Sequence, residues 1–182
     1  PDFKKYSEYC TSKDLNLAIH IVSCAIGRFD PDYLKPTPDP RLASWVKGTL
    51  AESTKADATT IQFQPPAGTI FPRTIRHKWF APNVHNDWMH INMIQVGNEF
   101  IQVGQFENTN QAIWTLKDCE RGFYETETKA YSAGTAAKGM YRGYGQAFTA
   151  DSSSSLLDEV AMRYGEFCNR LGIDHMECDG QE

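Results

Sequence analysis

The stretch Gly-Ile-Asp-His-Met-Glu-Cys-Asp-Gly-Gln-Glu at positions 172–182 decides the expected fold. Its first glycine can take the left-handed backbone that ends a helix, and the residues after it have the pattern of a short strand. In parallel α/β proteins, catalytic residues lie at the carboxyl ends of strands. The stretch therefore predicts a strand over 173–178 that ends in a functional acidic group. We expect a domain that ends at such a place to continue in further strands.

A strongly amphipathic segment precedes this strand. Ser155 and Asp158 have the spacing of a capping box, and Gly172 supplies the expected stop. The sequence therefore predicts a helix between these residues. Its apolar side chains recur at intervals of three and four on one face: Leu157, Val160, Ala161, Tyr164, Cys168 and Leu171.

An apolar segment near the amino terminus supplies a second strand. Residues 15–26 read Leu-Asn-Leu-Ala-Ile-His-Ile-Val-Ser-Cys-Ala-Ile, a near-continuous apolar run typical of a strand buried on both faces. A helix is the competing interpretation, but the β-branched content favours a strand. Together with the helix and the strand at the other end of the chain, this run predicts a β-α-β unit and an α/β fold class.

The middle of the chain has the texture of antiparallel β-structure. Polar and apolar residues alternate over 59–64 and 89–106, and Val-Gly-Asn-Glu-Phe at 96–100 has the pattern of a hairpin turn. This part precedes the amphipathic helix, so we expect it to be inserted between a strand and its helix. Three segments are expected: 1–45, with a helix, the buried strand and a proline-rich loop; 46–145, an inserted β-module; and 146–182, with the amphipathic helix and the following strand.

The composition excludes several classes of protein. A net charge of −5 has the wrong sign for non-specific binding to nucleic acid. No run approaches about 18 apolar residues, so no membrane span is expected. The five cysteines form no Cys-x-x-Cys pair, which argues against a zinc ribbon or a thioredoxin motif. No glycine-rich phosphate loop or nucleotide fingerprint is present, and we expect no cofactor.

Three residues are candidate catalysts. Asp179 and Glu182 lie on either side of the expected carboxyl end of the last strand, and two carboxylates can act as a general acid and base. The alternative is an Asp-Gly turn with a solvated glutamate. His20 lies in the middle of the apolar run, where it could face inward and move a proton. A hydrogen-bonded core histidine is the alternative.

A basic and aromatic cluster in an otherwise acidic chain provides candidate substrate-binding residues. Guanidinium groups bind carboxylate or sulfate with two hydrogen bonds, and an indole face stacks on a sugar ring. The alternative is a solvated face of a β-strand. Histidine and aspartate at positions 85, 87 and 90 match no known metal-ligand spacing, so no metal site is expected. The candidate binding residues are Tyr33, Arg73, Arg76, His77 and Trp79.

Several short motifs resemble bacterial (β/α)8-barrel enzymes that degrade polysaccharides and carry a β-module inserted in a βα loop. Leu-Ala-Ile-His-Ile-Val-Ser at 17–23 and Asp-Pro-Arg-Leu at 39–42 are the first of them. The module contributes 49–52, 94–101 and 119–122, and the final part contributes 169–174 and 178–182. The resemblance implies a fragment of a TIM-type barrel, with the remainder of the barrel in the same or another chain.

This resemblance implies a secreted or periplasmic enzyme that acts on a polysaccharide or oligosaccharide. A lyase needs a base, an acid and a group that neutralises the uronate carboxylate. His20, Tyr33 and the arginines would supply these roles on an anionic, glycosaminoglycan-like glycan, and the basic cluster favours this interpretation. A retaining or inverting glycoside hydrolase using Asp179 and Glu182 is the alternative. A non-catalytic carbohydrate-binding or interaction module is a second alternative.

Overall fold

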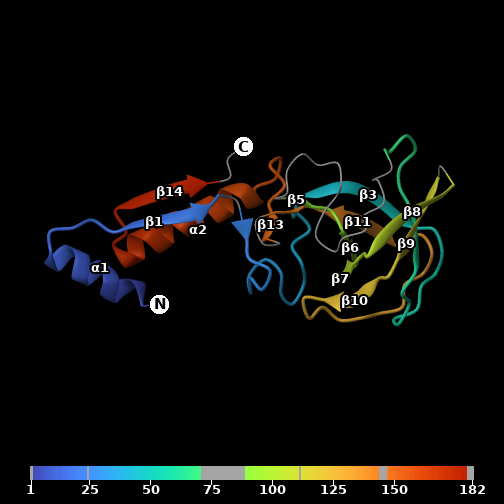
Figure 1. The fold of residues 1–182 in the computed structure, drawn as a ribbon, viewed down its shortest axis with the longest axis horizontal. Coiled ribbons are helices and arrows are strands. Elements are labelled where there is room, and N and C mark those ends of the chain that lie inside the picture. Colours follow the sequence, from blue (N-terminus) through green and yellow to red (C-terminus); the bar gives the residue numbers. More distant parts are fainter. Residues whose placement is uncertain (1, 24, 71–88, 111, 144–146, 180–182) are drawn as a thin grey trace. The chain divides into compact units, whose positions relative to one another are not determined.

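A computed structural model describes residues 2–23, 25–70, 89–110, 112–143 and 147–179. Two helices and fourteen strands lie in this part of the chain (Figure 1). The chain forms two compact units. One unit combines residues 1–25 with 150–182, and the other contains residues 26–149.

The first unit contains two helices and one pair of strands. Strands β1 (Ala18–Val22) and β14 (His175–Asp179) run parallel and side by side (Figure 1). Helix α2 (Leu156–Leu171) lies between them in the sequence, and α1 (Phe3–Ser12) precedes them. A parallel pair needs a long crossover, and here the connection contains residues 26–149 followed by α2.

Helix α2 forms where its periodicity predicts it. Leu156 and Val160 are buried on its apolar face, and Gly172 ends it with a φ of 63°. The predicted capping box is wrong, because Ser155 has helical backbone angles and its side chain makes no capping hydrogen bond. Asp158 and Glu159 still place negative charge in the first turn, where it stabilises the helix dipole.

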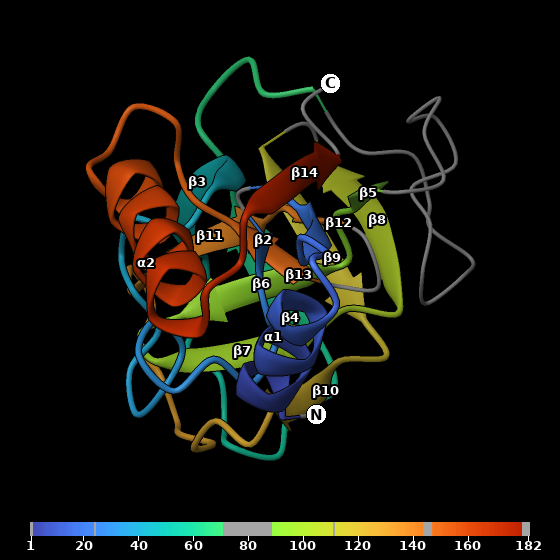
Figure 2. The ribbon, with the colours of Figure 1, turned by 90° about the vertical axis from the view of Figure 1, so that its left-hand side faces the viewer.

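The second unit is built around one large antiparallel sheet. Its eight strands lie in the order β10-β7-β6-β11-β3-β4-β9-β8, and Figure 2 shows β11, β6 and β7 side by side. The predicted hairpin at 96–100 is confirmed, since β6 and β7 pair antiparallel on either side of Gly97. The strands are β3 (Ser44–Leu50), β4 (Ile61–Gln64), β6 (Met93–Val96), β7 (Glu99–Gln102), β8 (Gln105–Asn110), β9 (Ile113–Lys117), β10 (Glu120–Phe123) and β11 (Ala136–Met140).

A smaller sheet of four short strands has the order β2-β13-β12-β5. Where its pairings are described, they are antiparallel as well. Its strands are β2 (Ala25–Ile26), β5 (Met89–His90), β12 (Arg142–Gly143) and β13 (Ala147–Thr149).

The core of the second unit shows that the large sheet curls. Phe63 of β4, Ile101 of β7 and Phe106 of β8 belong to a single buried cluster, although β7 is far from β4 and β8 in the sheet order. Trp45 of β3 also meets Phe106 of β8 with ring centroids 6.1 Å apart, although two strands lie between β3 and β8 in the sheet order. Neighbouring strands are about 4.8 Å apart, so the sheet bends around this cluster. Trp45 stacks on Trp114 with ring centroids 5.8 Å apart at the edge of this cluster.

The predicted fold class, an α/β TIM-type barrel unit, is wrong. The chain is mostly β-sheet, and the large sheet is antiparallel. A TIM barrel needs eight parallel strands, each followed by a helix. Among the strand pairings whose direction is described, only that of β1 and β14 is parallel. The sequence prediction extended this single pair to a whole barrel.

The predicted strand over 15–26 is also wrong in its length and burial. It divides into β1 and β2, which belong to different sheets. Along β1, exposed and partly buried residues alternate at first, as in a strand that is covered on one face only. His20 therefore does not face inward, and 57% of its side chain is exposed.

Candidate functional site

A histidine between two carboxylates is the candidate site of the first unit. The register of β1 and β14 places His20 opposite Glu177, and Asp179 lies two residues further along β14 on the same face. His20 Nδ1 lies 3.3 Å from Glu177 Oε2, and its Nε2 lies 3.5 Å from Asp179 Oδ2. The strand pair thus brings together two of the three predicted catalysts, His20 and Asp179.

All three side chains of this site are open to solvent. The exposed fractions are 57% for His20, 72% for Glu177 and 49% for Asp179. Ion pairs at such exposure contribute only about 0–1 kcal/mol to stability. The fold therefore gains little from these contacts, whereas a reactant in solution can reach the ring.

The site is held in place by hydrogen bonds at both ends of the strand pair. The Leu17 amide donates to Asp174 Oδ2 at 3.1 Å before the strands begin. Ser23 donates from both its amide (2.8 Å) and its hydroxyl (2.9 Å) to the carbonyl of Asp179 where they end. These bonds fix the register on which the position of His20 depends.

The chemistry of this arrangement is proton transfer. An imidazole can accept and donate a proton near neutral pH, which makes histidine the most frequent general acid or base. Carboxylates beside both ring nitrogens of His20 can hold the ring in one orientation. Two carboxylates next to a histidine are also a possible metal environment, but no group of residues suited to hold a metal ion is found in the described ranges.

Of the other predicted site residues, the structure describes only Tyr33, which belongs to the second unit. Tyr33 is half-buried in a turn of the second unit, where its amide donates to Asp30 Oδ1 at 3.1 Å. The following predicted residues lie outside the described ranges: Glu182, Arg73, Arg76, His77 and Trp79.

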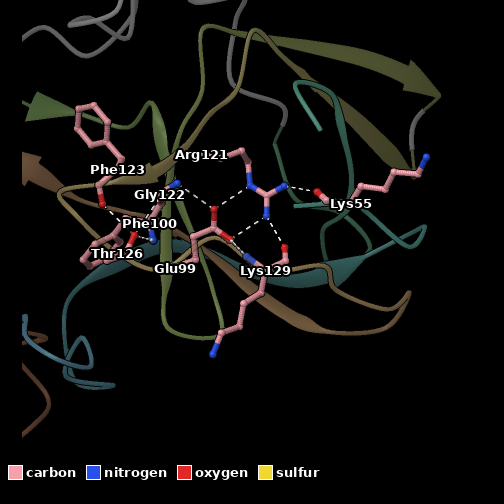
Figure 3. Close-up of polar contacts among 8 residues, drawn as sticks. All are labelled: Lys55, Glu99, Phe100, Arg121, Gly122, Phe123, Thr126 and Lys129. Carbon is pink, nitrogen blue, oxygen red and sulfur yellow. Dashed lines mark hydrogen bonds and ion pairs between the residues drawn. The ribbon is translucent and has the colours of Figure 1, made fainter. Parts of the chain in front are cut away.

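A buried ion pair in the second unit was not singled out from the sequence (Figure 3). Glu99 is completely buried and accepts two hydrogen bonds from the Arg121 guanidinium, at 2.8 Å and 2.7 Å. The amides of Gly122 (2.9 Å) and Lys129 (3.4 Å) also donate to this carboxylate. Burial and the neighbouring Glu99 carboxylate raise the pKa of Tyr131 to about 12.

Arg121 is equally well satisfied. Its guanidinium donates to the carbonyls of Lys55 and Lys129, as Figure 3 shows. Because the hydrogen-bonding groups of this pair are occupied, we assign Glu99 and Arg121 a structural role. A glutamate that starts an apolar strand, Glu-Phe-Ile at 99–101, is the sequence signal that points to such a pair.

Comparison with protein-family models, with curated proteins and with solved structures found no match to this chain. Within the described residues, no helix has the length and apolar character needed to span a membrane. We therefore infer the function from the residues of the chain itself.

Proposed function

We propose that the chain contributes a proton-transfer site to an enzyme that cleaves the glycosidic bonds of a polysaccharide. The observation that carries the proposal is the exposed imidazole of His20, held 3.5 Å from Asp179 and 3.3 Å from Glu177. A polymer can reach such a site, which a buried histidine would not allow. We extend the proposal to a secreted or periplasmic location, where such a polymer is met.

The proposed reaction is elimination from a uronate-containing glycan. A base removes the proton at C5, the bond from C4 to the bridging oxygen breaks, and a double bond forms between C4 and C5. The leaving oxygen takes up a proton from an acid. His20 would supply the base, and the carboxylates of Asp179 and Glu177 would stabilise the imidazolium that forms. The basic residues at 73–78 favour an anionic substrate.

The test is the cleavage of uronate polymers by the intact protein and by single variants. An unsaturated uronate absorbs in the ultraviolet, so elimination can be followed directly. We expect His20→Ala to lower kcat by about 10²-fold or more, the usual contribution of a general base. Asp179→Asn should lower kcat by a smaller factor, because it removes only the charge beside the ring.

His175→Ala is the matched control, because His175 is an exposed histidine on β14 and lies outside the cluster. It should retain the parent's activity. New reducing ends without ultraviolet absorbance would show that the bond is cleaved by hydrolysis and not by elimination. No cleavage of any glycan, or full activity of His20→Ala, would overturn the catalytic proposal and favour a binding module.

A further inference from the structure

An exposed aromatic ring in the second unit is held by three neighbours. The ring of Phe29 is 52% exposed. Exposure of a single apolar residue is common and does not by itself indicate a binding site. This ring differs because Arg28 Cζ lies 5.1 Å and Lys35 Nζ lies 5.6 Å from its centroid. Tyr124 meets it edge to face, with centroids 5.9 Å apart. The ring is therefore fixed while half of its surface faces water.

The two cations beside Phe29 differ in their own partners. Lys35 forms an ion pair with Glu125. Arg28 is exposed and has no acidic partner among the residues that the structure describes, where its recorded contact is the one with Phe29. Within the described residues, the Arg28 guanidinium is thus not held by a carboxylate. A guanidinium of this kind can bind a carboxylate or sulfate with two parallel hydrogen bonds.

The backbone that presents these residues is held by a compact turn. Asp30 Oδ1 accepts hydrogen bonds from the amides of Asp32 and Tyr33, at 3.0 Å and 3.1 Å. Leu34 anchors the turn with a side chain that is only 2% exposed. A turn tied in this way loses little conformational entropy when a ligand binds to it.

Two residues that contact Phe29 and Lys35 have a strained backbone. Tyr124 and Glu125 are consecutive non-glycine residues with φ of 56° and 63°, a backbone region that costs each of them on the order of 1–2 kcal/mol. The Tyr124 hydroxyl accepts a hydrogen bond at 2.9 Å from the fully buried Arg142, which holds this conformation. The strained pair meets Phe29 and Lys35 directly. Strain maintained in this way is typical of functional surfaces.

We propose that Arg28, Phe29 and Lys35 form a binding site for an acidic sugar ring, which we call the Phe29 platform. The exposed ring face would stack on the C–H groups of a pyranose, and Arg28 would bind its carboxylate or sulfate. This inference goes beyond the proposed function, because the platform lies within residues 26–149 and uses neither His20 nor Asp179.

The experiment measures binding rather than turnover. Isothermal titration calorimetry measures the affinity of the intact protein carrying His20→Ala for two oligosaccharides of equal length. One is a galacturonate oligosaccharide and the other is a neutral gluco-oligosaccharide. That substitution prevents turnover if the proposed catalytic site is real. Phe29→Ala removes the ring, and Arg28→Met removes the charge while keeping most of the aliphatic stem. Tyr9→Ala is the control, because Tyr9 is 61% exposed and also lies near a cation, Lys13.

We expect the galacturonate oligosaccharide to bind and each platform variant to weaken binding by about tenfold or more. Tyr9→Ala should bind like the parent, and the neutral oligosaccharide should bind at least about tenfold more weakly than the acidic one. Circular dichroism verifies that each variant is folded. Equal affinity of the folded variants and the parent, equal binding of the neutral oligosaccharide, or no binding at all would overturn the platform. Binding without catalysis would leave the platform standing and remove the proposed enzyme activity alone.

Discussion

Glu99 has a carboxylate that is completely removed from water, yet hydrogen bonds reach it from Arg121, Gly122 and Lys129. A buried charge is tolerated when it is paired and its remaining lone pairs are occupied. The pair also joins the start of β7 to β10, two neighbours at one edge of the large sheet. We therefore expect the contact to matter for folding.

Arg121→Met should lower the free energy of unfolding by about 3–5 kcal/mol, because it leaves Glu99 buried without a counter-charge. Urea unfolding of the parent and the variant measures this difference. Lys117→Met is the control, since it breaks an exposed ion pair with Glu107 that has the same 2.7 Å distance. It should change stability by less than about 1 kcal/mol. Similar losses in the two variants would contradict the structural role of the buried pair.

Tyr131 gives this network a pH dependence. Its phenol has a pKa of about 12 in the folded protein, against 10.0 as the ordinary value. Above about pH 10 the unfolded chain therefore binds fewer protons than the folded protein, and the free energy of unfolding falls as the pH rises towards about 12. Tyr131→Phe lacks this proton, so its unfolding free energy should decline less across that window. Thermal unfolding from pH 9 to pH 12 tests this, and parallel curves for the two proteins would refute it.

At the scale of elements, the sequence predicts the features that depend on a few neighbouring residues. The amphipathic period of α2 and the left-handed Gly172 are properties of a few neighbouring residues, and both are confirmed. The hairpin between β6 and β7 is confirmed for the same reason. Burial of a strand depends instead on what covers it from elsewhere in the chain. The apolar run at 15–26 therefore predicted a strand buried on both faces, whereas β1 is partly exposed along its length.

Glycine-to-alanine substitutions should have opposite effects on stability in strand β11 and in helix α2. A Cβ on Gly139 of β11 would lie 2.5 Å from Trp45 Cε2, and Gly139→Ala should destabilise the protein by about 1–3 kcal/mol. A Cβ on Gly165, inside α2, would meet nothing within 4 Å, and Gly165→Ala should stabilise the helix by up to about 1 kcal/mol. Denaturant unfolding of both variants checks the opposite signs. A stabilising Gly139→Ala would contradict the described packing of Trp45.

For the whole molecule, the order of strands could not be predicted. The neighbours β3 and β11 lie far apart in the sequence, and alternation within a strand does not identify its partner. The candidate site, too, could be predicted from the sequence only in part. His20 was identified as a polar residue in an apolar run, and Asp179 as an acidic residue at the carboxyl end of a strand. Their contact and the role of Glu177 depend instead on the register of β1 and β14. Phe29 and Arg28 become a candidate site only when folding brings Lys35 and Tyr124 to them.

The two units differ strongly in the core that each contains. Of the buried hydrophobic side chains described, only Ala150, Leu156, Val160 and Ile173 belong to the unit of residues 1–25 and 150–182. The others, including Trp114 and the rest of its cluster, lie in residues 26–149. Burial of apolar surface is the main stabilising contribution to folding. The unit of residues 26–149 should therefore be the more autonomous of the two.

A polypeptide of residues 26–149 should accordingly fold without the rest of the chain, because its core cluster is complete within those bounds. We expect a single cooperative urea transition and dispersed amide resonances in its two-dimensional NMR spectrum. Residues 1–25 joined to 150–182 by a flexible linker form the complementary polypeptide. With so few buried side chains to offset the loss of chain entropy, it should unfold gradually. A non-cooperative transition of the 26–149 polypeptide would contradict its predicted autonomy.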